Sequence, residues 1–396
     1  MTSDAANLRA EVEHALVTAG LDAVGVTGVE SFDRVRRGLE ARRAAGQHAG
    51  MSFTFSNPGR STEPRRLLRR ASSIVVGAMG YLEATPPRPG GVTGRVARYA
   101  WRDHYADLRA VLETGVVVLR DHGHRAMVIA DQNGLVDRAA AHRAGIGWWG
   151  RNANLLVPGA GSWFVLGSIV TDAELPVGDP PVADGCGRCT RCIPACPTGA
   201  IVDDGIIDGR RCLAWLVQDT GVFPRAHRVA LGDRLYGCDD CQDACPPGRR
   251  SVAGAEDGPA EDGPAGDVPV EIGRRPPDAW VEVIDLLART DDELLDRFGR
   301  WYIPRREPRY LRRNALVIIG NVGDPDQRRV RDALDGALAG DDPLLRAHAV
   351  WACARLGLTE RVDAAAGDPS ALVRAEVALA PSVPRAPRAA AVGAPP

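Results

Sequence analysis

The sequence predicts three structural parts: an N-terminal α/β domain, a cysteine-rich module and a C-terminal stack of α-helical repeats. Helical and strand patterns alternate over residues 1–177, as is typical of an α/β domain. Eight of the nine cysteines gather between positions 186 and 245. After residue 320, Gly-Asp-Pro helix starts recur three times (the second with a doubled Asp), which indicates structural repeats.

Apolar periodicity defines the elements of the α/β domain. Leu8, Val12 and Leu16 recur at helical spacing and predict a first helix that ends at Gly20. The same kind of pattern predicts further helices over about 32–45, 106–121 and 135–143, and strands over 22–29, 73–79, 127–131 and 162–171.

Asp131 ends one of these predicted strands. Carboxylates at strand ends that face a crevice are favoured places for chemistry in α/β folds. The alternative is an exposed turn residue, because an Asn-Gly pair follows at 133–134. Three glycines within 145–152 would permit a large ligand to approach the backbone closely. His104 is another candidate acid, for which the alternative is a hydrogen-bonded structural role.

The cysteine-rich module carries two related motifs. Residues 186–197 have the C-x2-C-x2-C-x3-C-P spacing of bacterial ferredoxins, and residues 238–246 repeat it in shortened form. In such pairs the fourth cysteine of each run ligates the cluster of the other run, and Cys212 completes eight ligands. We therefore expect one [4Fe–4S] cluster on Cys186, Cys189, Cys192 and Cys245, and a second on Cys196, Cys212, Cys238 and Cys241.

Other uses of these cysteines fit less well. A zinc ribbon would employ two pairs and leave four well-spaced cysteines unexplained. Disulfides would need an exported chain, but residues 1–20 lack a signal pattern, and no apolar run approaches membrane-spanning length. We therefore expect a cytoplasmic protein with reduced thiolates and no membrane partner. The ninth cysteine, Cys353, lies in an apolar helical stretch and is expected to be a buried structural thiol.

The C-terminal part begins after a stretch rich in Ala, Gly, Pro and acids at 251–272, which reads as a flexible linker. A capping box at 290–293 predicts a helix start. The Gly-Asp-Pro starts, at Gly323, Gly340 and Gly367, place Asp at the N-cap and Pro at N1. Residues 273–380 are thus expected to form HEAT-like helical repeats, and the Pro/Ala-rich residues 381–396 a disordered tail.

Residues 297–313 contain seven arginines and one glutamate, interleaved with Trp301, Tyr302 and Tyr310 among others. Arginine next to aromatic residues is typical of RNA-binding surfaces, whereas a solvated helix face is the alternative. The net charge of −2 gives no global argument for a polyanionic partner. The candidate RNA contacts are Arg305, Arg306, Arg309, Arg312 and Arg313.

Over residues 1–380 the chain resembles the epoxyqueuosine reductase family of cobalamin-dependent enzymes. The best match is 131–152, with an aspartate, an acid-Arg pair at 137–138 and a Gly-Ile-Gly-Trp-Trp-Gly-Arg-Asn run. Segments 161–167, 236–242 and 312–315 match as well. The chain departs from the family pattern at Gly134 (proline), Asp137 (glutamate), Arg151 (lysine) and Ser168 (an acid), and in the aromatic stretch Trp101–Tyr105.

The resemblance implies reduction of epoxyqueuosine to queuosine at the wobble position of tRNA. It implies a cobalamin-binding catalytic domain over 1–177, a two-cluster module over 178–250, and two [4Fe–4S] clusters and cob(II)alamin as cofactors. Asp131 falls on the family's catalytic acid, while Asp137 is expected to face elsewhere and to be tolerant. The cobalamin contacts are expected at Arg60, Tyr81, Tyr99, Tyr105, Gly147, Trp148, Asn152 and Ser162.

The expected partners are the anticodon stem-loop of tRNA and a low-potential electron donor that the sequence does not identify. A monomer is expected. Two alternatives stay open: a corrinoid iron–sulfur reductase acting on another substrate, and a non-catalytic iron–sulfur electron carrier. Cobalt in the purified protein would eliminate the carrier, and tRNA binding would disfavour a small-molecule reductase.

The cysteine pattern makes a first prediction about metal content. Anaerobic reconstitution with iron and sulfide should give about eight irons per chain, because each of two cubanes holds four. Replacement of the ninth cysteine, Cys353→Ser, should leave the iron content unchanged. A stable value near four irons, or stoichiometric zinc measured by the same metal analysis, would contradict the assignment.

Overall fold

The computed structural model describes residues 3–178, 180–248 and 277–387. They form two compact units. The first contains the described residues of Met1–Thr85, Arg102–Cys212 and Asp239–Arg275, and the second those of Pro86–Trp101, Leu213–Cys238 and Pro276–Pro396. These units cut across the predicted cysteine-rich module, because residues 213–238 contribute apolar side chains to the core of the second unit. The predicted linker at 251–272 lies outside the described residues.

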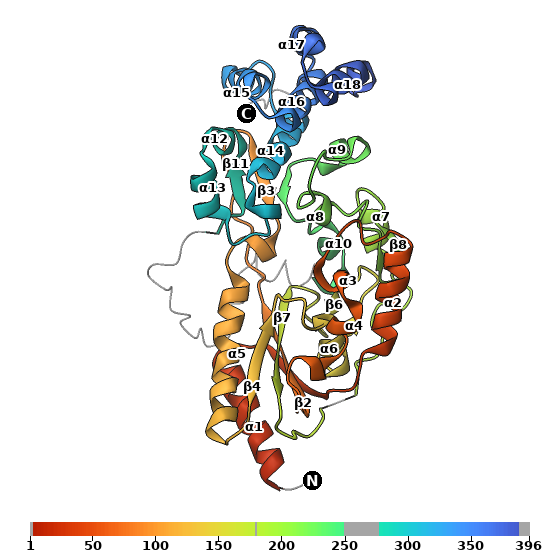
Figure 1. Cartoon of the computed structure of the whole chain (residues 1–396), viewed down its shortest axis with the longest axis vertical. Helices are drawn as coiled ribbons and strands as arrows, with labels where there is room; N and C mark the ends of the chain where they lie inside the picture. Colours follow the sequence, from red (N-terminus) through yellow and green to blue (C-terminus); the bar gives the residue numbers. More distant parts are fainter. Residues whose placement is uncertain (1–2, 179, 249–276, 388–396) are drawn as a thin grey trace, which may run out of the picture. The chain divides into compact units, whose positions relative to one another are not determined.

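The first unit is built around a four-stranded sheet in the order β1-β2-β7-β4 (Figure 1). Its strands are β1 (Ala23–Gly28), β2 (Ser73–Gly80), β7 (Phe164–Thr171) and β4 (Ala126–Ala130). Every neighbouring pair is antiparallel, with Gly80 opposite Phe164 and Ala130 opposite Gly167. Because β2 and β4 both pair with β7, these two strands run in the same direction and end at the same edge of the sheet.

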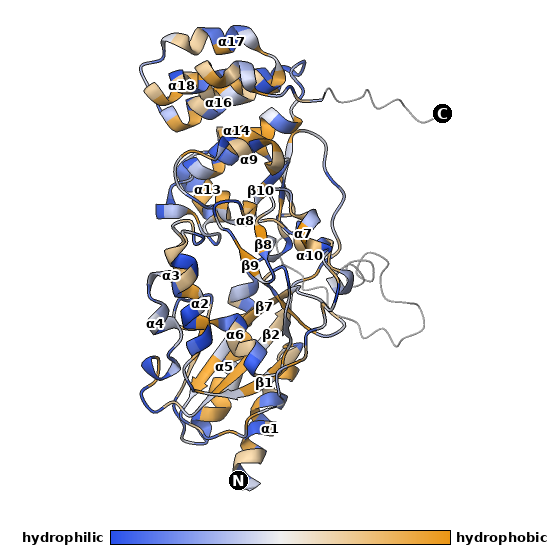
Figure 2. Cartoon of the chain, turned by 90° about the vertical axis from the view of Figure 1, so that its right-hand side faces the viewer, coloured by the Kyte–Doolittle hydropathy of each residue, from blue (hydrophilic) through white to orange (hydrophobic). Residues whose placement is uncertain are grey.

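Helices cover both faces of this sheet. Successive side chains of β2 point to opposite faces of the sheet. On one face, Ile74, Val76 and Ala78 pack in a core with α6 (Asp137–Arg143). On the other face, a Cβ added to Gly77 would touch Leu112 of α5 (His104–Asp121). Helix α1 (Ser3–Thr18) packs beside α5. Figure 2 shows these strands as mostly hydrophobic and α2 (Asp33–Ala44) as hydrophilic, in keeping with Leu39 as its buried residue.

Short elements complete the first unit and carry its loops. They are α3 (Phe53–Ser56), α4 (Pro58–Ser61), η1 (Pro64–Arg66), β5 (Trp148–Trp149), β6 (Leu155–Leu156), α7 (Cys192–Ala195), β8 (Ile201–Asp203), β9 (Ile206–Ile207) and α10 (Asp240–Asp243). Strands β5 and β6 pair as an antiparallel hairpin, and α7 packs against α10. The predicted helices and long strands of the α/β domain are all present, with ends shifted by a few residues.

The second unit joins a small sheet to a series of helices. Strands β10 (Arg234–Tyr236), β3 (Thr93–Val96) and β11 (Trp280–Glu282) lie in that order. The helices are η2 (Arg98–Ala100), α8 (Leu213–Leu216), α9 (Arg225–Leu231), α12 (Val283–Ala288), α13 (Asp291–Phe298), η3 (Pro304–Arg306), α14 (Arg309–Val322), α15 (Arg328–Ala339), α16 (Pro343–Leu356), α17 (Thr359–Ala364), η4 (Ala365–Gly367), α18 (Ala371–Leu379) and η5 (Ala380–Ser382).

The predicted helix starts are confirmed in part. The capping box of Thr290 and Glu293 is present, and Asp342 caps α16 by accepting a hydrogen bond from the Leu344 amide. The predictions that Asp324 and Asp368 are N-caps are wrong. Helix α15 begins later, at Arg328, and α18 begins at Ala371. Asp368 instead accepts from the Ser370 amide and pairs with Arg346.

Repetition is visible in the arginines of these helices. Arg331, Arg346 and Arg374 each donate to the backbone carbonyl six residues earlier. Helix α16 packs against α14, α15 and α18. Beyond α18, the Ala386 amide donates to the Arg355 carbonyl, so ordered contacts extend past the predicted boundary at residue 380. Within the described residues, no helix is both long and apolar enough to cross a membrane.

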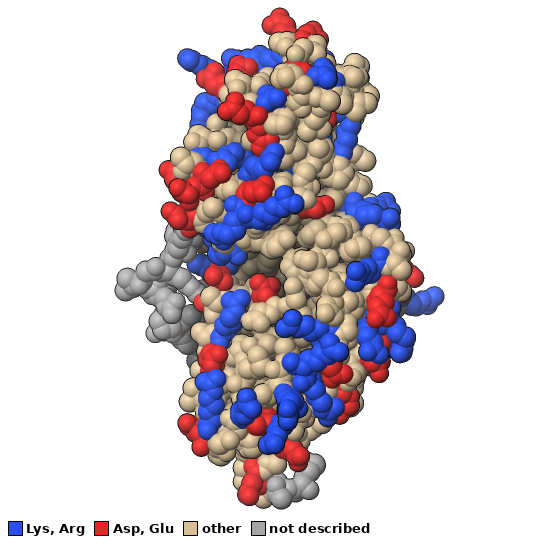
Figure 3. Space-filling model, in the orientation of Figure 1, with Lys and Arg blue, Asp and Glu red and all other residues tan. Residues whose placement is uncertain are grey.

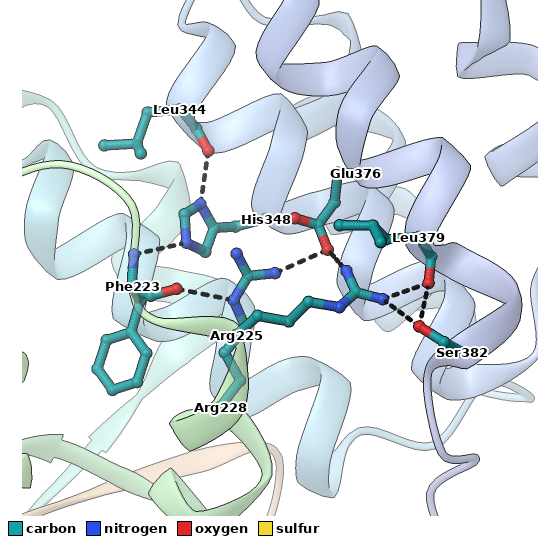
Figure 4. A network of polar contacts seen from close by, with 8 residues as sticks. All are labelled: Phe223, Arg225, Arg228, Leu344, His348, Glu376, Leu379 and Ser382. Carbon is teal, nitrogen blue, oxygen red and sulfur yellow. Dashed lines mark hydrogen bonds and ion pairs between the residues drawn. The ribbon is translucent and has the colours of Figure 1, made fainter. Parts of the chain in front are cut away.

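A buried polar network ties the α9 segment to helices α16 and α18 of the second unit (Figure 4). His348 on α16 donates from Nδ1 to the Leu344 carbonyl and accepts at Nε2 from the Phe223 amide at 3.2 Å. Glu376 of α18 pairs with Arg228 at 3.0 Å and also with Arg225. Both imidazole nitrogens are therefore used in the neutral form, and burial followed by the Arg228 charge lowers the pKa of His348 well below its usual value.

Because His348 is buried in its neutral form, this network makes the free energy of unfolding depend on pH. Below the ordinary histidine pKa of about 6.5 the unfolded chain takes up a proton at this residue, while the folded unit resists it. The free energy of unfolding should fall as pH decreases from about 6.5 toward the lowered pKa, with a contribution of about 1.4 kcal/mol per pH unit from one proton.

Urea unfolding at a series of pH values measures this contribution. His348→Gln should be less stable near neutrality but should lose that part of the acid slope. His14→Gln, at an exposed position of α1, is the matched control and should retain the wild-type slope. An unchanged slope in His348→Gln would contradict the account.

Candidate functional site

Four cysteines of the first unit line one cavity of about 270 Å³. They are the thiols predicted to share a cluster, Cys186, Cys189, Cys192 and Cys245. Burial raises the pKa of Cys192, and the neighbouring thiols raise it further because thiolates repel one another. A bound iron cluster removes this conflict, since a coordinated thiol is deprotonated by the positive charge of its metal. The donor set therefore fits a cluster.

The four thiols line this cavity together. Among the described residues, no three His, Cys, Asp or Glu side chains are grouped as ligands of one metal ion. Zinc would need all its ligands about 2.0–2.3 Å from a single centre. A multi-iron cubane differs from zinc in this respect, because its thiolates bind different irons.

The other predicted set begins with Cys196, whose sulfur accepts a hydrogen bond from the Ala200 amide at 3.1 Å. Burial opposes ionisation, but amide hydrogen bonds from Thr198, Ala200 and Ile201 lower the pKa of Cys196 overall. Hydrogen bonds to ligating sulfurs tune the reduction potential of a cluster. Cys212 and Cys241 belong to the same unit, and Cys238 directly precedes Asp239, where the chain re-enters it.

Polar residues gather at one edge of the four-stranded sheet. Tyr81 follows the end of β2, Asp131 follows the end of β4, and Ser162 lies just before β7, the strand between them. Asp131 adopts a left-handed backbone with φ of 52°, which ends the strand abruptly. The alternative of an exposed turn residue is thus correct, because Asp131 is also exposed. The residue nevertheless follows a strand at the edge where ligands bind in α/β folds.

The groups at this edge are electrostatically coupled. Asp131 is exposed, yet partial desolvation raises its pKa, the Arg109 charge opposes this, and Asp103 adds to it. Burial, with a further contribution from Asp131, raises the pKa of Asp137 to about 8. The pKa of Tyr105 is raised as well, mainly by burial and then by the charges of Asp131 and Asp137. The site therefore contains two interacting carboxyl groups, of which Asp137 is neutral below about pH 8.

Asp137 corrects an expectation from the sequence. It was predicted to face elsewhere, but it lies close enough to Asp131 for the two charges to interact. Its buried Oδ1 has no hydrogen-bond partner among the described residues. The left-handed turn at Asp131 redirects the chain, so helical spacing from that residue could not predict where Asp137 lies.

The predicted cobalamin contacts divide between the units. Tyr81, Tyr105, Trp148, Asn152 and Ser162 belong to the first unit, and Trp148 and Asn152 also line the cysteine cavity. The exposed Arg60 lies in α4, whose neighbouring Ser61 hydroxyl donates to the Asn133 carbonyl in the loop after Asp131. Tyr99 belongs instead to the second unit, where it packs against Tyr236 and Gln218.

The glycines of 145–152 have a structural use that differs from the prediction. Gly145, with φ of 78°, ends α6, and a Cβ on Gly147 would lie 2.2 Å from the Leu156 carbonyl oxygen. A Cβ on Gly150 would likewise collide with Leu156. These residues allow the β5–β6 hairpin to close, and the contact of Gly147 with cobalamin stays a prediction.

The arginine-rich segment is less available than predicted. Arg313 is fully buried, and its guanidinium donates to backbone carbonyls between Leu216 and Gly221, so its prediction as an RNA contact is wrong. Arg309 pairs with Asp342 at 2.6 Å, and Arg312 pairs with Asp291. Figure 3 shows arginine and acidic side chains intermixed on the visible face.

Arg305 and Arg306 are different, because both are exposed and both have a positive φ, 53° and 55°. This conformation is unfavourable for residues other than glycine, and such strain often marks functional loops. The preceding Tyr302 is 43 % exposed, which is unusual for a large aromatic side chain in this protein. The loop thus presents two cations and an aromatic ring to solvent.

Comparison with known proteins identifies both the cluster segment and the whole chain. A family described as a 4Fe-4S double cluster binding domain matches residues 185–248. The epoxyqueuosine reductase of Staphylococcus aureus is 30% identical over 362 residues, which cover 89% of this chain and 90% of that protein. The Escherichia coli epoxyqueuosine reductase is 32% identical over 346 residues, covering 85% and 86%.

Solved structures agree with these relatives. A crystal structure of epoxyqueuosine reductase with an epoxyqueuosine-modified tRNA-Tyr stem loop has a TM-score of 0.81 at 27% identity, covering 94% of this chain and 98% of the other. Epoxyqueuosine reductase from Streptococcus thermophilus has a TM-score of 0.81 at 26% identity, covering 95% and 99%. With cluster thiols, sheet-edge acid and full-length similarity in agreement, the chain belongs to the epoxyqueuosine reductase family.

Proposed function

We propose that this protein reduces epoxyqueuosine to queuosine in tRNA, with cobalamin and two [4Fe–4S] clusters as cofactors. One observation carries the proposal: the acid at the sheet edge and the four-cysteine cavity belong to one compact unit. An electron-transfer group and a proton donor are the two things that this reaction requires. The reaction consumes two electrons and two protons, converts the epoxide to an alkene and releases water.

The residues at the sheet edge fit cobalamin. Trp148 Nε1 and Ser162 Oγ are buried polar atoms without a hydrogen-bond partner among the described residues. Such atoms are costly unless a ligand satisfies them, and the amide groups around a corrin ring are suitable partners. When bound, cobalamin supplies a cobalt that takes up electrons singly and acts on the strained epoxide carbon. Trp148, Asn152, Ser162 and Tyr105 are the residues that we propose to hold it.

Asp131 is the proposed acid for the departing oxygen. An aspartate at its ordinary pKa would hold almost no proton at neutral pH, so the raised pKa is a requirement of this role. The neutral Asp137 beside it adds no negative charge below about pH 8. Asp131 ionisation at higher pH would remove the proton, so turnover should fall as pH rises through its raised pKa.

The remaining parts serve electron supply and RNA binding. We propose that residues 178–250 relay electrons from an external donor through the two clusters, each on its predicted four cysteines. We further propose that residues 273–380 act as HEAT-like repeats that contact the tRNA. The related reductase crystallised with a tRNA stem loop supports this partner, and Arg305 and Arg306 are the favoured phosphate contacts, with Arg309 and Arg312 available if their ion pairs open.

Substitution of the acid tests the proposed function. Asp131→Asn preserves size but cannot donate a carboxylic proton, so conversion of epoxyqueuosine tRNA should fall by about 10²–10⁴-fold. Asp137→Asn is the matched control and should lose less, because an amide resembles the neutral carboxyl already present there. Mass spectrometry of nucleosides measures conversion, while cobalamin and iron content should be unchanged. Near-normal turnover in Asp131→Asn, with the chemical step rate-limiting, would contradict this role.

The exposed arginine loop makes a separate prediction about tRNA affinity. Replacing Arg305 and Arg306 together by alanine should weaken binding and reduce the salt slope of log Kd by about 0.7–0.9 for each phosphate that the loop neutralises. Arg328 and Arg329 of α15, replaced together, remove the same charge from exposed positions and should have little effect. Unaltered affinity of the loop variant at low salt would place the RNA-binding surface elsewhere.

A further inference from the structure

A buried amide links the cluster module to the sheet edge within the first unit. Gln242 lies in α10, between the ligand cysteines Cys241 and Cys245, and is 8% exposed. Its Nε2 is 3.0 Å from the Tyr81 hydroxyl and 3.2 Å from the Ser162 carbonyl oxygen. One side chain thus contacts two residues at the ligand-binding edge.

These two contacts determine the direction of each hydrogen bond. A carbonyl oxygen can only accept, so the atom of Gln242 that faces Ser162 must be the NH₂ nitrogen. The same nitrogen faces Tyr81, and therefore the tyrosine hydroxyl must accept from it. A hydroxyl also carries one proton to donate, whereas the hydrogen bond between Tyr81 and Gln242 is one that the hydroxyl accepts. Gln242 therefore turns the Tyr81 proton away from itself and leaves it to be donated.

The Tyr81 ring is held in place by its neighbours. It packs edge-on against Trp163 with ring centroids 6.0 Å apart, and it lies 5.8 Å from His104. The Asp239 carboxylate interacts electrostatically with Tyr81, and so, more weakly, does Tyr105, which also interacts with Asp131. Since Tyr81 and Asp131 extend from strands that end at the same edge with only β7 between them, a ligand there can meet both.

The segment that carries Gln242 is itself fixed against the sheet edge. Trp163 Nε1 donates to the Gly248 carbonyl at 3.1 Å. A Cβ on Gly161, whose φ is 80°, would lie 2.8 Å from the Gly248 backbone, so the two segments touch directly. Residues 242–248 are thereby attached at both ends, and Gln242 has little freedom to turn away from Tyr81.

We propose that Tyr81 donates a hydrogen bond to the oxygen that leaves the epoxide, and that Gln242 is the positioning residue that fixes this donor. The inference rests on the proposed function. As two electrons open one C–O bond, negative charge develops on oxygen, which takes a proton from Asp131. The second C–O bond breaks as the alkene forms, and with a second proton from solvent the oxygen leaves as water. Tyr81 keeps its own proton throughout and stabilises that charge, as oxyanion-hole donors do.

Two variants and their combination test the proposal. Tyr81→Phe should lower turnover about 10- to 100-fold, since a single donor is lost, with cobalamin affinity, iron content and cluster EPR signals unchanged. Gln242→Met keeps size without a donor and should lower turnover in the wild-type background. In the Tyr81→Phe background it should have no further effect, because it acts only through that hydroxyl. Tyr310→Phe removes a hydroxyl from a buried tyrosine of α14 and serves as the control.

Several results would overturn it. Wild-type turnover in Tyr81→Phe would exclude the donor, and reduced cobalamin affinity in that variant would assign its proton to a corrin side chain instead. Additive losses in the double variant, or loss of iron in Gln242→Met, would show that Gln242 acts through cluster assembly. Conversion by the unmodified protein, measured first, tests the proposed function independently.

Discussion

The return of the chain to the first unit at Asp239 is the constraint on which the redox site depends. Cys245 must reach a cavity whose other thiols, Cys186, Cys189 and Cys192, come from a distant part of the sequence. The contacts of Gln242 with Tyr81 and of Trp163 with Gly248 hold it there. Without this attachment, Cys245 would not be held beside the other three thiols of the cavity.

The same attachment relates electron supply to proton supply. The cysteine cavity shares Trp148 and Asn152 with the loop that follows α6, and α6 begins at Asp137 beside the proposed acid. Low solvent access assists both chemistries: desolvation raises carboxyl pKa values, which favours proton donation, and it strengthens the influence of hydrogen bonds on buried sulfurs. A single apolar environment can therefore prepare both groups for their tasks.

Local rules predicted what depends on local spacing. Cysteine spacing, the Thr290 capping box and the long elements of the α/β domain follow from residues near in sequence, and the structure contains them. Tertiary packing decided the rest. Arg313 reads as a surface cation, but carbonyls of a loop far away in sequence surround it. The left-handed turn that brings Asp137 beside Asp131 leaves no recognisable signal in sequence periodicity.

The most direct measurement is queuosine formation by the intact protein. Anaerobically reconstituted protein carrying both clusters would be incubated with epoxyqueuosine tRNA and a reductant, with and without cobalamin, and the nucleosides analysed by mass spectrometry. Our account predicts queuosine only when cobalamin is present. Unchanged epoxyqueuosine from protein loaded with cobalamin and both reduced clusters would contradict it.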